Sequence, residues 1–164
     1  MSKLHEVAAE VVRAALDAGV TVGTAESLTA GLVSASLADI PGASGMLQGG
    51  VVAYQNSVKA DVLGVPEDLL ERVGSVDGAV AAAMASGARK ACGAGLGVST
   101  TGVAGPETHD GKAVGTVFIG IAGEHGEKSF EYAFTGGRAA IRSQACQAAL
   151  ERLLAEIESL LYQR

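Results

Sequence analysis

The sequence predicts an α/β protein, folded as a three-layer α/β/α sandwich around a mixed, mostly parallel sheet. Helix-type and strand-type patterns alternate along most of the chain, and a hairpin-type pair of strands interrupts this alternation near its end. Such an alternation usually covers both faces of a parallel sheet with helices. The chain has 164 residues, 48% of them hydrophobic and 18% charged, which suits one globular domain spanning residues 1–164.

The first half of the chain opens with apolar residues at helical spacing over residues 3–18, and Gly19 is a typical residue to end such a helix. The next elements are a strand over Val20–Ala25, a helix from Ser27 or Leu28 to Ala38, a turn at Pro41–Gly42, a strand over Gly49–Tyr54, a short helix over Ser57–Leu63 and a helical turn or two over Pro66–Val73.

The second half predicts one more helix and strand before the hairpin. In order, it contains a helix over Val76–Ala91, a strand over Leu96–Thr101, a polar glycine-rich loop over 102–113, strands over Val114–Ala122 and Lys128–Phe134 joined by Gly123–Gly126, and a long amphipathic helix over Ile141–Leu161.

Composition excludes several kinds of partner. The net charge is −6, aromatic residues make up 4% and tryptophan is absent, so neither a basic stripe nor a base-stacking platform indicates nucleic-acid binding. No apolar run approaches the roughly 20 residues of a membrane span, and the N-terminus lacks the apolar core of a signal peptide. Cys92 and Cys146 are expected to be reduced thiols, and the protein to be cytoplasmic with no membrane partner.

Ser27 lies where a strand is followed by a helix, in the stretch Thr24–Gly31. A serine there lies near free backbone N–H groups that can hold an oxyanion, so it is a candidate nucleophile. A plain helix cap by Ser27 or Thr29 explains the same residues, and this stretch alone favours the cap.

Tyr54 and Lys59 follow the next predicted strand and are candidate partners of Ser27. Neither is distinctive alone, because surface lysines are common, and no histidine lies in a recognisable catalytic motif. If Ser27 is a nucleophile, a lysine is the natural alternative base. Its pKa would have to be lowered by burial or nearby positive charge.

Two further stretches suggest ligand binding. Thr101 and Gly102 begin the glycine-rich loop after a strand, where backbone amides can meet a ligand, although glycines needed only for a tight turn would look the same. Arg138 and Arg142 are four residues apart at the start of the last helix, where positive charge opposes the helix dipole. Phosphate binding and surface salt bridges explain these arginines equally well.

Together these stretches resemble the C-terminal domain of the CinA (competence/damage-inducible protein A) family, which includes stand-alone nicotinamide-nucleotide amidases. The resemblance runs from about Leu4 to Leu154 through AESLTAG, PGASGMLQGGVVAYQNSVK, LGV, TTGVAGP, VGTVFIGIA and GGRAAIR. It implies an α/β/α fold and hydrolysis of nicotinamide mononucleotide to nicotinate mononucleotide and ammonia, without metal or cofactor. It also implies a homodimer, and the N-terminal domain of longer family members is expected to be absent.

The resemblance assigns the catalytic roles to Ser27, Tyr54 and Lys59. The residues expected to bind substrate are Glu26, Thr29, Ala30, Thr101, Gly102, Arg138 and Arg142. The amides of Thr29 and Ala30 are expected to hold the oxyanion, and Tyr54 to orient Lys59 or relay its proton.

The chain also departs from the usual family pattern. Leu28-Thr29-Ala30-Gly31 replaces Cys-Thr-Gly-Gly, Val76-Asp77-Gly78-Ala79 replaces Val-Ser-Glu-Glu, Lys112-Ala113 replaces Lys-Pro, and Gly105-Pro106-Glu107-Thr108-His109 replaces Gly-Pro-Asp-Gly-Gly. There are therefore two alternative hypotheses: a nucleotide-binding or interaction domain with little activity, and an amidase for another small carboxamide.

Overall fold

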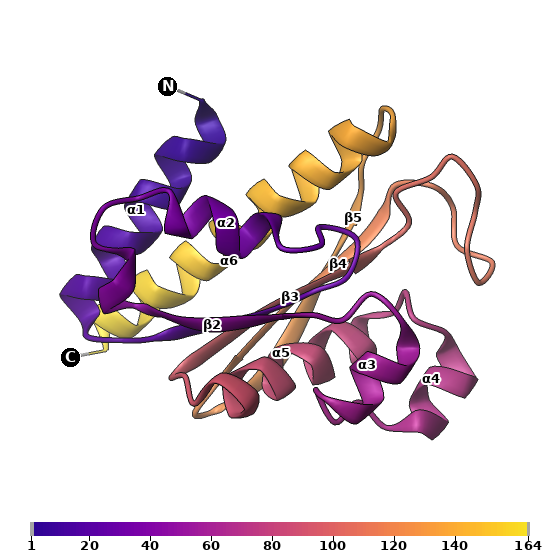
Figure 1. Ribbon diagram of the computed structural model, residues 1–164, viewed down its shortest axis with the longest axis horizontal. Coiled ribbons are helices and arrows are strands. Elements are labelled where there is room, and N and C mark those ends of the chain that lie inside the picture. The colour runs from indigo at the N-terminus through magenta and orange to yellow at the C-terminus, as the bar shows by residue number, and fades with distance from the viewer. Residues whose placement is uncertain (1, 164) are drawn as a thin grey trace.

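The computed structural model describes residues 2–163 and contains a five-stranded sheet between two layers of helices (Figure 1). In chain order its elements are α1 (Lys3–Ala18), β1 (Val22–Glu26), α2 (Leu32–Ala38), η1 (Ala43–Gly45), β2 (Leu47–Val52), α3 (Asn56–Asp61), α4 (Glu67–Val73), α5 (Gly78–Cys92), β3 (Leu96–Gly102), β4 (Thr116–Gly123), β5 (Gly126–Ala133) and α6 (Arg138–Tyr162). Among the described residues, no helix is both long and apolar enough to cross a membrane.

The strand order is β2-β1-β3-β4-β5. Strand β1 pairs in parallel with both β2 and β3, whereas β3–β4 and β4–β5 are antiparallel pairs. Helices α1, α2 and α6 cover one face of the sheet, and α5 covers the other, with α3 and α4 on the same side (Figure 1). The predicted α/β/α sandwich with a mixed sheet is confirmed. Because β1, β2 and β3 are parallel, their carboxyl ends lie at the same edge of the sheet.

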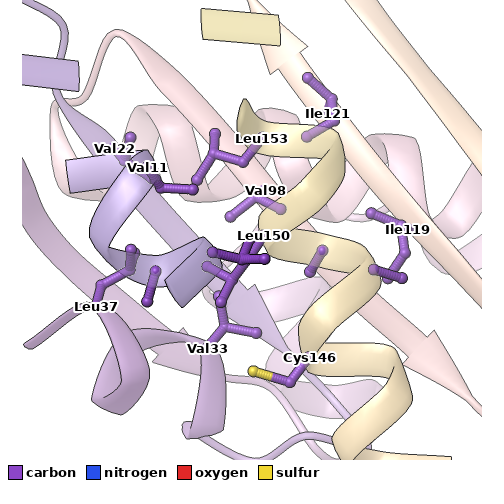
Figure 2. Close-up of a cluster of buried hydrophobic side chains, with 14 of the residues drawn as sticks. Val11, Val22, Val33, Leu37, Val98, Ile119, Ile121, Cys146, Leu150 and Leu153 are labelled. Atoms are coloured by element: carbon purple, nitrogen blue, oxygen red, sulfur yellow. The ribbon is translucent and has the colours of Figure 1, made fainter. Parts of the chain in front are cut away.

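The larger core cluster lies between the sheet and the layer of α1, α2 and α6 (Figure 2). Leu150 and Leu153 of α6 are fully buried there against strand residues such as Val22 and Ile119. Burying each such side chain contributes about 1.5–3 kcal/mol, so this cluster is a main source of stability. Cys146 is buried in the same layer, and both cysteines are free thiols in the structure.

Helix α2 begins at Leu32, four or five residues later than the sequence predicts. The intervening residues form a turn in which Ala30 and Gly31 both have positive φ angles of 50° and 103°. The helix start is satisfied from outside the turn, because the carboxylate of Glu26 accepts hydrogen bonds from the amides of Val33 and Ser34. Helix α6 begins at Arg138, three residues before the predicted Ile141.

Helix α5 approaches the sheet very closely, because the strand residues beneath it are glycines. Ala81, Ala85 and Ala88 share one face of α5 and lie over Gly120, Gly97 and Gly23, respectively. These glycines stand on three neighbouring strands, and Gly23 and Gly97 are directly paired. A methyl group on Gly97 or Gly120 would overlap a carbonyl oxygen of α5.

We expect Gly97→Ala to destabilise the protein by about 2–3 kcal/mol, because its new methyl group overlaps the main chain of Ala85. Gly95→Ala is the matched control, since a methyl group there meets only ordinary contacts with Thr21. Urea denaturation of both variants measures the difference. Equal stability of the two variants would contradict the close approach of α5.

Candidate active site

The site lies at the sheet edge where β1, β2 and β3 end. Ser27 directly follows β1, Tyr54 comes two residues after β2, and Thr101 and Gly102 close β3. Parallel strands deliver their carboxyl ends to the same edge, so these separate motifs meet there. They line a cavity of about 630 Å³ together with Leu28, Gln55, Asn56, Ser75, Val103, Ala104, Gly105, Pro106, Glu107, Thr108, His109 and Arg138.

Lys59 of α3 is fully buried beside Ser27. Its Nζ lies 3.1 Å from Ser27 Oγ, 2.8 Å from the carbonyl oxygen of Ala53 and 3.0 Å from that of Tyr54. Burial disfavours the charged ammonium and lowers the pKa of Lys59 to about 8. In its neutral form the amine has two hydrogens, which the two carbonyls can accept, so its lone pair is left for the hydroxyl of Ser27.

Glu26 was expected to bind substrate, but its carboxylate accepts hydrogen bonds from residues of the protein itself. The side chain is 1% exposed, and Oε1 accepts hydrogen bonds from Thr29 Oγ1 at 2.7 Å and from the Val33 amide at 2.8 Å. Oε2 accepts two more from the amide and hydroxyl of Ser34, both at 3.1 Å. The side chains of Glu26 and Thr29 therefore stabilise the turn that carries Ser27, which corrects the expectation that these side chains contact the substrate.

Arg142 is also occupied by the turn and not placed for a ligand. Its Nε donates to the carbonyl oxygen of Leu28 at 2.8 Å, and Nη2 donates to that of Thr29 at 3.1 Å. In a planar trans peptide the N–H points away from the preceding C=O. By fixing the Leu28 carbonyl, Arg142 therefore sets the direction of the Thr29 amide, which donates to no other described residue.

The amide of Ala30 was the second expected oxyanion donor. It donates instead to the carbonyl oxygen of Ser27 at 3.1 Å. The amide of Ser27 is likewise used, since it donates to the carbonyl oxygen of Thr100 at 3.0 Å. Of the two expected donors, the Thr29 amide is therefore the one that keeps its hydrogen free.

Tyr54 contacts Lys59 through its main chain and not through its phenol. The side chain is 50% exposed, and its hydroxyl accepts a hydrogen bond of 2.9 Å from Nη2 of Arg138. Arg138 also donates from Nη1 to the carbonyl oxygen of Gly105 at 2.5 Å. The expected proton relay by the Tyr54 hydroxyl is not supported by this geometry, and Arg138 ties the loops after β2 and β3 together at the cavity.

Sequence reasoning missed Ser75, His109 and Asp110. Ring atom Nε2 of His109 lies 3.1 Å from Ser75 Oγ and 3.2 Å from Asp110 Oδ2. In a Ser-His-Asp triad the acid contacts the other ring nitrogen, so this cluster is not a second hydrolytic triad. The Asp110–Gly111 dipeptide is a hairpin-turn signal that could have revealed how the loop folds back, but nothing local links it to Ser75.

No group of three or more His, Cys, Asp or Glu side chains within residues 2–163 is arranged to hold a metal ion. The fold and site together define the class of this protein as an α/β/α domain in which a serine at the carboxyl edge of the parallel strands contacts a buried lysine.

The chain belongs to the family of the CinA C-terminal domain, whose model matches residues 4–157. A protein of Desulforamulus reducens, named as competence-damage inducible, is 47% identical over 149 residues, which are 91% of this chain and 36% of that protein. A CinA-like protein of Frankia casuarinae is 47% identical over 131 residues, covering 80% and 30% of the two chains. This chain thus spans about a third of the length of the curated relatives it matches.

Solved structures agree with this membership. A CinA superfamily protein from Klebsiella pneumoniae superposes with a TM-score of 0.92 at 29% identity, covering 96% of this chain and 99% of that one. The competence/damage inducible protein CihA from Agrobacterium tumefaciens superposes with a TM-score of 0.90 at 34% identity, covering 94% and 96%.

We expect an aryl sulfonyl fluoride to modify Ser27 at a rate that depends on neutral Lys59. Because the pKa of Lys59 is about 8, the rate should rise about tenfold per pH unit below pH 8 and level off above it. Mass spectrometry after timed labelling between pH 6 and 10 measures this. Lys59→Met should remove the reaction and Lys90→Met, at an exposed lysine, should not. A rate independent of pH would rule out the pairing.

Proposed function

We propose that this domain is an amidohydrolase that converts nicotinamide mononucleotide to nicotinate mononucleotide and ammonia. The observation that carries the proposal is the 3.1 Å contact between Ser27 Oγ and the buried amine of Lys59. Ser27 lines the cavity, so a substrate can reach its hydroxyl. An amine with a lowered pKa beside a serine hydroxyl is a recognised way of activating the nucleophile. The substrate itself comes from the resemblance to nicotinamide-nucleotide amidases, as do the proposed homodimer and cytoplasmic location.

In the proposed acylation, neutral Lys59 takes the proton of Ser27 Oγ as that oxygen attacks the carboxamide carbon. The amide of Thr29, whose hydrogen is unused, is the proposed donor to the negative charge that develops on the carboxamide oxygen. The carbon–nitrogen bond then breaks, and the proton on Lys59 passes to the departing nitrogen, which leaves as ammonia.

Deacylation repeats these roles with water. Lys59, neutral again, removes a proton from a water molecule as its oxygen attacks the ester carbon. The bond to Ser27 Oγ breaks, the proton returns to Oγ, and the nicotinate nucleotide departs. The carbonyls of Ala53 and Tyr54 accept the other hydrogens of the amine throughout, so the base keeps its orientation.

We expect the purified protein to release ammonia from nicotinamide mononucleotide in the presence of a chelator. Ser27→Ala and Lys59→Ala should each reduce turnover by at least about 1,000-fold, and the double variant should be little worse, because the two side chains act as one unit. A coupled ammonia assay measures turnover, with Lys90→Ala as the control for an exposed lysine. Loss of activity with chelator and recovery with zinc would refute the serine mechanism.

The two arginines give a second test of the substrate. Arg138 lines the cavity and is exposed, so Arg138→Ala should reduce kcat/KM for the mononucleotide by roughly 10- to 150-fold through loss of a phosphate contact. Nicotinamide riboside, which lacks the phosphate, should be hardly affected. Arg142→Ala should reduce kcat/KM for both substrates and lower the melting temperature, because Arg142 stabilises the turn that carries Ser27. Equal losses for both substrates in Arg138→Ala would exclude the phosphate contact.

A further inference from the structure

His109 lines the same cavity as Ser27 but has no part in the chemistry described above. Its Nε2 lies 3.2 Å from Oδ2 of Asp110. The Ser75 hydroxyl donates its hydrogen to Oδ2 of Asp110 at 3.4 Å, so Nε2, which lies 3.1 Å from Ser75 Oγ, is the donor to that oxygen and has a proton. Nδ1 has no partner among the described residues and is the nitrogen available to a ligand.

The histidine is held in place by a short hairpin turn. His109 and Lys112 pair through backbone hydrogen bonds of 3.3 and 2.8 Å, and Asp110 and Gly111 form the turn with φ angles of 48° and 74°. Oδ2 of Asp110 also accepts a hydrogen bond of 3.1 Å from the amide of Ser75. The tip of this loop is therefore held against Ser75.

Ser75 connects this attachment to the end of β3. Its carbonyl oxygen accepts a hydrogen bond of 2.6 Å from Oγ1 of Thr101, which closes β3 and lines the cavity. The position of His109 is thus fixed relative to the strand end that helps build the site. Its ring is nevertheless 60% exposed, so a ligand can reach it.

Between His109 and Arg138, the wall of the cavity offers backbone donors that have no partner. The amides of Ala104, Gly105, Glu107 and Thr108 donate no hydrogen bond to any residue that the structure describes. Ala104 is 7% exposed and Gly105 is buried, and buried amides are almost always paired with protein, water or ligand. Such a run of free donors suits an anion with several acceptor oxygens.

We propose that this wall is the subsite for the phosphate-sized anionic group of the substrate, and that His109 contacts that group opposite Arg138. The identity of the substrate rests on the proposed function, but the anion subsite rests on the free amides and on the held histidine. A phosphate monoester carries three acceptor oxygens, which can be shared by Arg138, the loop amides and Nδ1 of His109 when that nitrogen is protonated. Glu107 is the acidic side chain of this wall and is exposed.

Inorganic phosphate is the probe for a first test that needs no turnover. Titrating it into the full chain while following backbone amide NMR signals should shift Ala104, Gly105 and Thr108. His109→Ala should raise the phosphate Kd about tenfold, the loss expected for one partly exposed charge-assisted hydrogen bond. His125→Ala is the matched control, because His125 lies on the β4–β5 turn at the other end of β3 and lines a different cavity.

A kinetic test follows the same variants. His109→Ala should raise KM for nicotinamide mononucleotide about tenfold with kcat within twofold, and leave nicotinamide riboside unaffected. His109→Gln keeps a polar side chain but cannot carry a positive charge, so it should raise KM as His109→Ala does. Circular dichroism checks that both variants fold. An unchanged phosphate Kd in His109→Ala, or amide shifts confined to other residues, would overturn the subsite. If no ammonia is released from the mononucleotide, the proposed function fails while the phosphate titration still decides the subsite.

Discussion

The burial of one amine is the constraint on which the site depends. Lys59 is completely covered, and a charged ammonium in that position loses its hydration, which is why its pKa falls to about 8. Two main-chain carbonyls and one hydroxyl replace the lost water. Helix α3 begins four residues after the end of β2, so the short segment that follows this strand supplies both the acceptor carbonyls of Ala53 and Tyr54 and the base. Without that burial, Lys59 would be an ordinary surface lysine and Ser27 an ordinary cap.

The nucleophile turn is built by two charged side chains that both act on the main chain. Glu26 takes the place of a helix cap for α2 from the end of β1, and Arg142 pulls two consecutive carbonyls of the turn toward α6. The turn needs these contacts because Ala30 is held at a positive φ, a conformation that costs free energy for any residue with a Cβ. Charged side chains that look like ligand contacts in the sequence therefore fix the main chain of this turn, including the direction of the Thr29 amide.

Periodicity and turn residues were enough to predict the layers and the element order. The resemblance assigned Ser27, Tyr54 and Lys59 to one site, and the parallel strands explain why they meet at one sheet edge. The start of α2 was predicted too early, since the cap comes from Glu26, outside the helical pattern. The role of Arg142 and the phenol of Tyr54 were also misjudged, because hydrogen bonds across about a hundred residues leave no periodic signal in a single sequence. The resemblance located these residues but could not say which atoms they contact.

The packing of α5 connects stability to the shape of the cavity. The glycines of β1, β3 and β4 let α5 lie so close to the sheet that its register is fixed by main-chain contact, which is less adaptable than side-chain packing. Helix α5 begins at Gly78, capped by the side chain of Asp77, so its fixed position also determines where Ser75 lies. Ser75 in turn holds both Thr101 and Asp110. A shift of α5 along the sheet would therefore move one wall of the cavity. Gly87 of α5 also lies against the main chain of Leu63, four residues after Lys59, so the same packing bears on the segment that carries the base.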